Sequence, residues 1–238
     1  MNRRKFSAAA LRLALASACA PALPLCAPRP NSAQEARPAP TRKPSKVFQE
    51  ARAVNRNAPP DPAAFEFEMN GFAYHVNANG NGRRTKGRKT RGFNLRLDGG
   101  ETVASLLYSE FEGDLLLLLH TDIEGVRLGF VTRLEQPSMR GLWRQRIPAG
   151  EISQPLRDGH DLYVTGLGFV GKLDLRTGDY AWQHDDLEFE RGDGSPPLHT
   201  FDEPELDGGA VLFRERPVYN PRRTLAVDRK SGKVIRVE

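Results

Sequence analysis

Short runs in which apolar and polar residues alternate are the feature that most constrains the fold of this chain. Phe65 to Met69 and Phe72 to Val76 alternate with a period of two, and Asn70-Gly71, a dipeptide typical of hairpin turns, separates them. Phe93 to Leu97 continues the alternation. No segment shows a long, capped helical periodicity. The sequence therefore predicts an all-β fold of antiparallel sheets.

One run is apolar throughout. Leu115 to Leu119 are consecutive leucines, preceded by Glu112-Gly113-Asp114 and by an alternating run from Thr102 to Tyr108. The run is far shorter than the ~20 residues that a transmembrane helix needs. It predicts a strand that is covered on both faces and that pairs with Thr102–Tyr108 across the turn.

Residues 1–27 have the composition of a secretory signal peptide. Met1 to Lys5 is positively charged, Ser7 to Leu25 is mostly Ala and Leu, and small-residue cleavage patterns follow. We therefore predict a periplasmic or secreted protein. Arg3-Arg4-Lys5-Phe6 also matches the core of twin-arginine signals, but Asn2 stands where Ser or Thr is usual. The sequence leaves the choice between the general and the twin-arginine export route open.

Both cysteines, Cys19 and Cys26, lie in this leader. We therefore expect no disulfide, thiol chemistry or cysteine-based zinc site in the mature domain. Cys19 is an alternative site for a lipid anchor, although Leu15 stands one position earlier than such signals usually have it. Residues 28–62 are rich in Pro, Ala, Arg and Asn and predict a flexible tether, and residues 63–238 form the predicted domain.

The formal net charge of +5 is distributed unevenly. Residues 1–58 contain 11 Lys and Arg against 2 Asp and Glu, whereas residues 59–238 contain 24 against 28. The basic character thus belongs to the leader and the tether. A mildly acidic domain argues against nucleic acid as its partner.

A weak repeat marks the C-terminal half of the chain. Its clearest copy runs Leu173-Asp174-Leu175-Arg176-Thr177-Gly178-Asp179-Tyr180-Ala181-Trp182. We expect Asp174 to accept hydrogen bonds from turn amides, Gly178 to adopt a positive φ in the turn, and Trp182 to pack against the next sheet.

Two fainter copies accompany it. One has Asp228 and Gly232, with Arg236 at the tryptophan position. The other runs from Leu134-Glu135 to Ser138, with Met139 at the glycine position and Trp143 at the tryptophan position.

The pattern resembles the PQQ-type β-propeller repeat, whose blades end in Leu-Asp-x-x-Thr-Gly-x-x-x-Trp. The tryptophan positions 143, 182 and 236 are 39 and 54 residues apart, and the longer interval contains the acidic stretch 185–207, interpreted as an inserted loop. At about 40–50 residues per blade, the predicted domain has room for about four blades of a small or incomplete propeller. A β-sandwich with Thr-Gly and Ser-Gly hairpins is the alternative.

A strongly basic segment follows the glycine- and asparagine-rich Asn77–Gly82, and we place it on a loop. Its cations are Arg83, Arg84, Lys86, Arg88, Lys89 and Arg91. One hypothesis is that they contact an anion or a partner, and the other is a solvated hairpin loop. No aromatic residue interrupts the segment, so that it predicts no stacking platform for single-stranded nucleic acid.

The remaining motifs are weak. Gly166 to Gly171 has the spacing of a dinucleotide-binding fingerprint, but a strand and a Thr-Gly turn follow instead of the required helix, so we expect no nucleotide. Arg191–Ser195 is similar to a calcium loop but lacks the EF-hand pattern, and a solvated acidic loop is the default. No metal-ligand spacing is found among the histidines, which are His75, His120, His160, His184 and His199.

The resemblance implies two broad functions. Quinoprotein dehydrogenases bind PQQ and a metal in a large propeller, whereas other proteins with such blades bind proteins and carry no cofactor. Because this chain has room for about four blades, we expect no cofactor and a non-catalytic binding or scaffold role in the cell envelope, with a protein or polysaccharide partner. The alternatives are a polysaccharide-binding or polysaccharide-hydrolysing domain using carboxylates of 185–207, and a remnant quinoprotein dehydrogenase.

Overall fold

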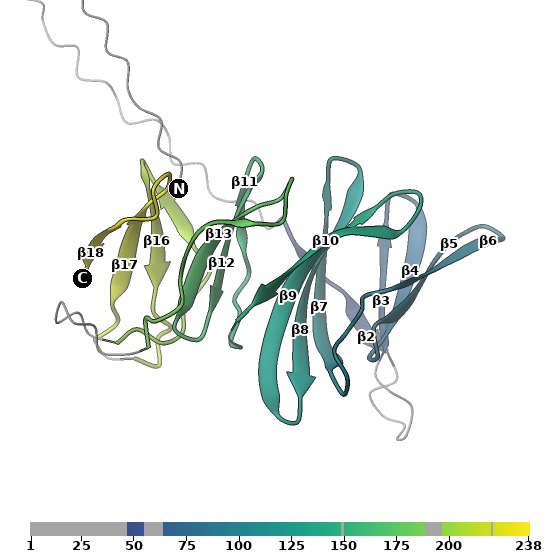
Figure 1. Ribbon diagram of the computed structural model, residues 1–238, viewed down its shortest axis with the longest axis horizontal. Coiled ribbons are helices and arrows are strands. Elements are labelled where there is room, and N and C mark those ends of the chain that lie inside the picture. The colour runs from purple at the N-terminus through teal and green to yellow at the C-terminus, as the bar shows by residue number, and fades with distance from the viewer. Residues whose placement is uncertain (1–46, 55–63, 149, 189–196, 220) are drawn as a thin grey trace, which may run out of the picture. The chain divides into compact units, whose positions relative to one another are not determined.

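Antiparallel sheets make up the part of the chain that the structure describes (Figure 1). The computed structural model describes residues 47–54, 64–148, 150–188, 197–219 and 221–238, all within one compact unit, Pro40–Glu238. None of these residues belongs to a helix, and so none to a helix long and apolar enough to cross a membrane. The predicted signal peptide and most of the predicted tether lie outside the described residues.

The described residues form four sheets, and neighbouring strands in each sheet are antiparallel. The first sheet consists of β2 (Arg52–Val54), β3 (Ala64–Met69), β4 (Phe72–Asn77), β5 (Asn81–Lys86) and β6 (Lys89–Asn94). The second sheet consists of β1 (Gln49–Glu50), β7 (Thr102–Phe111), β8 (Asp114–Ile123), β9 (Val126–Glu135) and β10 (Arg140–Ile147).

The other two sheets have four strands each. The third sheet consists of β11 (Leu156–Asp158), β12 (Asp161–Gly166), β13 (Phe169–Asp174) and β14 (Tyr180–His184). The fourth sheet consists of β15 (Glu205–Asp207), β16 (Ala210–Arg214), β17 (Thr224–Asp228) and β18 (Val234–Val237).

Two-residue turns set the register of the β3–β4 and β7–β8 hairpins. Asn70 and Gly71 have φ of 54° and 72°, and Glu112 and Gly113 have φ of 53° and 84°. Positive φ at both central residues matches the right-handed twist of the flanking strands. The predicted turns at these two places are confirmed, and Thr102–Tyr108 pairs with the leucine strand as expected.

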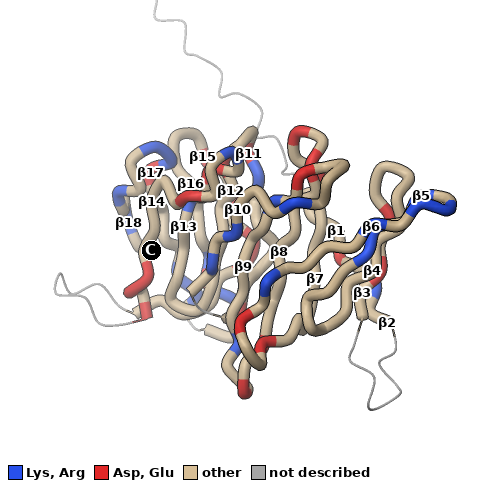
Figure 2. Tube along the Cα trace, turned by 45° about the vertical axis from the view of Figure 1, so that its right-hand side comes forward, with Lys and Arg blue, Asp and Glu red and all other residues tan. Residues whose placement is uncertain are grey.

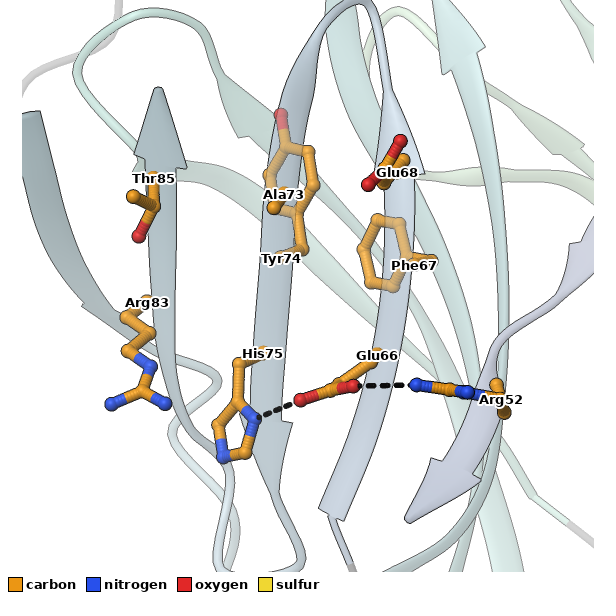
Figure 3. Close-up of a pocket in the computed structure, with 9 residues that line it drawn as sticks. All are labelled: Arg52, Glu66, Phe67, Glu68, Ala73, Tyr74, His75, Arg83 and Thr85. Atoms are coloured by element: carbon orange, nitrogen blue, oxygen red, sulfur yellow. Dashed lines mark hydrogen bonds and ion pairs between the residues drawn. The ribbon is translucent and has the colours of Figure 1, made fainter. Parts of the chain in front are cut away.

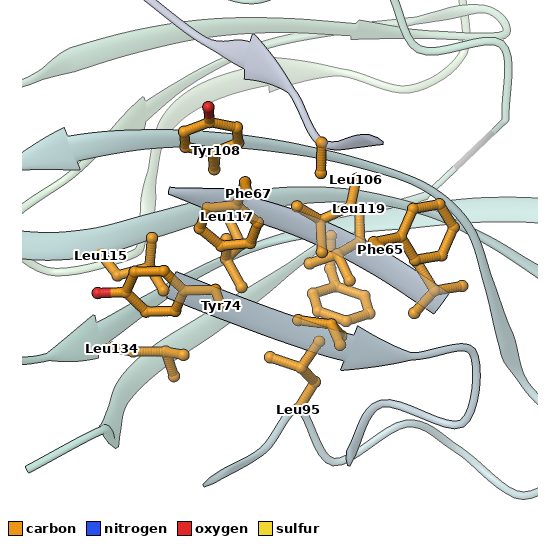
Figure 4. Close-up of a cluster of buried hydrophobic side chains, with 14 of the residues drawn as sticks. Phe65, Phe67, Tyr74, Leu95, Leu106, Tyr108, Leu115, Leu117, Leu119 and Leu134 are labelled. Atoms are coloured by element: carbon orange, nitrogen blue, oxygen red, sulfur yellow. The ribbon is translucent and has the colours of Figure 1, made fainter. Parts of the chain in front are cut away.

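The leucine strand β8 is buried on both faces, as predicted. Leu115, Leu117 and Leu119 belong to the hydrophobic cluster shared with the first sheet (Figure 4). Leu116 and Leu118 belong to the cluster shared with the third sheet. Because successive side chains of a strand point to opposite faces, one leucine run supplies two cores.

Three hydrophobic clusters join the four sheets face to face in the order in which the sheets occur along the chain. The first cluster lies between the first and second sheets, the next between the second and third, and the last between the third and fourth. Blades of a β-propeller pack in this way. The all-β, propeller-like fold is therefore confirmed, and the two-sheet sandwich is wrong.

A tryptophan connects the third sheet to the fourth. Trp182 on β14 lies over Gly232, which has φ of 74°, and the Trp182 indole Nε1 donates a hydrogen bond to the Arg229 carbonyl at 3.2 Å. The Gly232 amide in turn donates to the Asp228 carbonyl at 2.9 Å, and the Ser231 amide to Asp228 Oδ1 at 2.8 Å. The tight turn thus presents both a flat surface and a carbonyl to the indole.

The contact between the second and third sheets has the same design. Trp143 on β10 lies over Gly178, which has φ of 83°, and its Nε1 donates to the Leu175 carbonyl at 3.2 Å. The Gly178 amide donates to the Asp174 carbonyl at 2.8 Å, and the Asp179 amide to Thr177 Oγ1 at 3.2 Å. In both contacts the accepting carbonyl is three residues before the glycine, so the sequence repeat is also a repeat of inter-sheet contacts.

The contact between the first and second sheets differs. At the turn of the second sheet Met139 replaces the glycine and still adopts a φ of 58°. No indole covers this turn. Arg84 of β5 instead donates to the Pro137 carbonyl at 3.0 Å, and the ring of Phe67 stacks between Tyr74 and Tyr108, with centroids 4.7 Å and 4.2 Å away.

Two sequence expectations are corrected. Residues 47–54, within the predicted tether, form β1 and β2, because Phe48 and Ala51 are buried in the clusters on either side of the second sheet. The predicted acidic loop 185–207 contains strand β15 and contributes Leu187, Leu198 and Phe201 to the third cluster. Apolar residues between the carboxylates therefore anchor this segment.

A buried carboxylate, Glu101, anchors the connection between β6 and β7 through hydrogen bonds and ion pairs. The Glu101 side chain is 1% exposed and accepts hydrogen bonds from Arg146 Nη1 and Thr121 Oγ1, both at 2.6 Å. Arg144 lies 3.3 Å away. Burial raises the pKa of Glu101, but the hydrogen bonds from Arg146, Thr121 and the Asp98 amide outweigh it and lower the pKa to about 2.

The indole contact predicts a difference between two glycine substitutions in the fourth sheet. A Cβ at Gly232 would lie 2.5 Å from the Trp182 ring, whereas a Cβ at Gly208, where φ is 55°, has open space around it. Both Gly232→Ala and Gly208→Ala carry the strain of a positive φ, but only the first must displace the indole. We expect the free energy of unfolding, measured in urea, to fall by about 1–3 kcal/mol more for Gly232→Ala than for Gly208→Ala. Equal losses would contradict the contact.

The Glu101 network predicts a pH-dependent effect. Because the folded-state pKa is lowered, the carboxylate stabilises the fold above its usual pKa near 4.5, and this contribution disappears as the pH falls towards about 2. We expect Glu101→Gln to cost about 3–5 kcal/mol at neutral pH, as breaking a buried ion pair does. The difference from wild type should shrink steadily in unfolding curves measured at pH values below 4.5. A difference independent of pH would show that the carboxylate is not ionised in the fold.

Candidate functional site

The basic segment is a pair of strands rather than the predicted loop. Strands β5 and β6 pair from Asn81 to Asn94, around a turn at Gly87, which has φ of 57°. The asparagines and glycines before the segment suggested a loop, but pairing of β5 with β4 orders it. Because side chains alternate along a strand, the cations are divided between two faces of the first sheet.

One face gathers Arg84, Lys86, Lys89 and Arg91 around a groove of about 450 Å³. Arg84 stands directly opposite Arg91 across the strand pair, and Lys86 directly opposite Lys89. Figure 2 shows this concentration of Lys and Arg on β5 and β6. Among the described residues, none of the four forms an ion pair with a carboxylate. We call these four residues the basic face.

An aromatic ring lies within the basic face, which the sequence interpretation missed. The Arg84 guanidinium lies 4.3 Å and the Lys86 ammonium 4.6 Å from the ring centre of Phe72. Phe72 begins β4, one strand away, so that only the register of the β4–β5 pair brings it here. Arg84 is 9% exposed and bonded to Pro137, and its first role is structural. Lys86, Lys89 and Arg91 remain exposed.

The opposite face of the same sheet carries a hollow of about 430 Å³ (Figure 3). Arg83 and Thr85 of β5 line it together with Glu68 of β3 and with Ala73 and His75 of β4. The remaining basic residue, Arg88, lies in the turn between β5 and β6. The structure therefore separates Arg83 from the basic face.

A row of polar side chains crosses this hollow. Glu66 accepts a hydrogen bond from Arg52 Nη2 at 3.1 Å and lies 3.2 Å from His75 Nδ1 (Figure 3). His75 Nε2 lies 2.9 Å from Asn77 Oδ1. The hydrogen bonds from His75 and Arg52 hold the pKa of Glu66 below its usual value. Glu66 therefore has hydrogen-bond partners on both sides. The sequence alone gives no signal for this row, because only the register of the paired strands brings its residues together.

The other histidines are placed individually. His184 Nε2 lies 2.8 Å from the Gly232 carbonyl, and the His199 ring stacks on Tyr219. His160 Nε2 lies 3.8 Å from Asp161. His120 Nε2 is the one buried side-chain nitrogen or oxygen in the described ranges without a hydrogen-bond partner, and burial lowers the pKa of His120. No three His, Cys, Asp or Glu side chains of the described residues gather as a metal site would require.

The remaining candidate motifs have structural surroundings. Gly166 to Gly171 spans the hairpin between β12 and β13, as the sequence predicts, with Gly168 at φ of 59° in the turn. In the acidic segment Asp202 pairs with Arg222, and Glu205 with Arg214. The calcium-like Arg191–Ser195 lies outside the described residues.

Comparisons with known proteins find solved structures that are similar to this chain at low sequence identity. No protein-family model and no curated protein matches the sequence. The quinohemoprotein alcohol dehydrogenase of Comamonas testosteroni is 12% identical, with a TM-score of 0.39 over 81% of this chain and 45% of that chain. The quinohemoprotein alcohol dehydrogenase ADHIIG of Pseudomonas putida HK5 is 9% identical, with a TM-score of 0.44 over 81% and 36%. The glutaminyl cyclase of Myxococcus xanthus is 16% identical, with a TM-score of 0.30 over 80% and 75%. The chain spans less than half of either dehydrogenase chain.

Proposed function

We propose that this chain is a non-catalytic binding protein of the bacterial cell envelope, and that the basic face of the β5–β6 hairpin contacts an anionic partner. The envelope location is supported by the signal-peptide composition of residues 1–27. The PQQ-type repeat supports a scaffold whose specificity resides at its surface. The observation that carries the binding proposal is the pairing of like charges on β5 and β6.

Like charges directly opposite each other on neighbouring strands destabilise a sheet. Arg84 faces Arg91 and Lys86 faces Lys89, with no described carboxylate to compensate them. The exposed hairpin therefore holds positive potential that an anionic group would relieve on binding. Phe72 and the stems of the lysines add apolar surface beside the charges.

The polysaccharide-hydrolase alternative has less support. Its candidate carboxylates include Asp202 and Glu205, and each is engaged by an arginine of the fourth sheet region. A glycosidase would need two carboxyl groups that face each other across a groove. An anionic polysaccharide remains within the proposal as a partner of the basic face.

The proposed export predicts a processed N-terminus. Protein recovered from a periplasmic or secreted fraction should begin between Ala20 and Ala36 when its N-terminal sequence is determined. An intact Met1 on protein that stays in the cytosol would contradict the envelope location. It would leave the charge argument for the basic face untouched.

The proposed binding predicts a selective effect of three substitutions. Lys86→Gln, Lys89→Gln and Arg91→Gln together should weaken salt-sensitive binding of the full chain to dextran sulfate at least tenfold, about 1.4 kcal/mol. The matched control is Lys230→Gln, Lys233→Gln and Arg236→Gln, which removes equal charge from exposed positions of the fourth sheet. Equal weakening in both triple variants would show that only net charge matters.

The same variant has a second readout that needs no ligand. Removing like charges from opposite positions should raise the stability of the free protein, by about 0.2–1 kcal/mol for each relieved pair. The gain should diminish at high salt, because exposed charges are screened. A variant less stable than wild type would mean that these side chains are structural.

A further inference from the structure

The hollow on the face of the first sheet opposite the basic face is a second candidate binding site. We propose that it binds a small zwitterionic ligand of the short-peptide type, with the ligand's ammonium at Glu68 and its carboxylate at Arg83. This inference goes beyond the proposed function and does not depend on it. It rests on the shape of the hollow, on two charges that pair with no described residue and on the separation of these charges.

The shape follows from the strand register. Glu68, Ala73 and Thr85 stand opposite one another on β3, β4 and β5. The adjacent row on the same face contains Glu66, His75 and Arg83, again directly opposite one another. Ala73 is the one small side chain among these larger neighbours, and the space above it is the hollow (Figure 3).

The charged side chains of the hollow differ in whether they have partners. Glu66 has a partner on both sides, because it forms an ion pair with Arg52 and lies 3.2 Å from His75 Nδ1. Glu68 and Arg83, in contrast, form no ion pair or side-chain hydrogen bond with any described residue. One carboxylate and one guanidinium are thus available on different sides of Ala73. A ligand with both an ammonium and a carboxylate would satisfy them simultaneously.

The separation of the two groups selects the ligand length. Glu68 and Arg83 lie on strands β3 and β5, with β4 between them. Two strand spacings amount to about 10 Å, and the two-residue offset between the rows adds about 7 Å along the strands, so that the two residues lie about 12 Å apart on the diagonal, part of which the two side chains span. A free amino acid carries its charges on one carbon, whereas a dipeptide holds them further apart. Thr85 and His75 line the space between, where a peptide group could form hydrogen bonds.

The test is a titration of the full chain with the dipeptide Ala-Ala, followed by NMR chemical shifts of backbone amides. We expect saturable shifts in β3, β4 and β5 that begin at millimolar concentrations. N-acetyl-Ala-Ala lacks the ammonium and Ala-Ala-amide lacks the carboxylate, and each should bind at least tenfold more weakly. A hollow that recognises only one charge would discriminate against only one analogue, which would overturn the zwitterion proposal.

Three variants assign the contacts. Glu68→Gln should remove the discrimination against N-acetyl-Ala-Ala, and Arg83→Gln the discrimination against Ala-Ala-amide. Ala73→Leu should abolish binding by filling the hollow. The controls Glu124→Gln and Lys233→Gln change exposed charges in other turns and should leave the titration unchanged.

The outcomes are separable from those of the basic face. The triple variant of Lys86, Lys89 and Arg91 leaves every lining residue of the hollow intact and should still bind Ala-Ala. Absence of any saturable shift with Ala-Ala up to about 10 mM would overturn the inference, since weaker binding would exceed the millimolar range expected here. Dextran sulfate binding would remain as a test of the proposed function alone.

Discussion

The indole that covers the neighbouring sheet's turn is the interaction that orients the second, third and fourth sheets on one another. Hydrophobic packing alone brings apolar sheet faces together, but it is non-directional. Trp143 and Trp182 add direction, because each donates a hydrogen bond to one carbonyl and rests on one glycine of the next turn. A larger residue than glycine at that place would separate the indole from the turn. The tryptophan and the glycine of the repeat are therefore required together, because each makes the contact of the other possible.

The first sheet departs from this design, and the candidate sites lie there. In the second sheet, Trp143 stands opposite Arg133 on the neighbouring strand. At the corresponding place in the first sheet, Arg91 stands opposite Arg84. Arg84 replaces the indole by reaching the Pro137 carbonyl, which leaves Arg91 exposed beside other cations. The opposite face of this sheet belongs to none of the three clusters and is polar. A sheet covered on one face can thus offer its remaining surface to ligands.

The sequence allowed prediction where a residue's role is local or follows a simple period. Leu115–Leu119 indicated a strand buried on both faces, and Gly178 a tight turn. Strands β1 and β2 were missed because Phe48 and Ala51, the residues beside them, are buried only against the neighbouring sheets. The hollow around Ala73 was missed for a related reason. It exists only when three strands are in the correct register, and no single strand contains it.

Exchange of the two indole protons with solvent measures the inter-sheet contacts most directly. The chain has two tryptophans, so that its NMR spectrum should contain two indole Nε1–H signals. If both donate to carbonyls of the next turn, both protons should exchange with solvent far more slowly than those of free indole, and Gly232→Ala should accelerate exchange of one. Exchange of either proton at the free-indole rate in the folded protein would contradict the proposed inter-sheet contact.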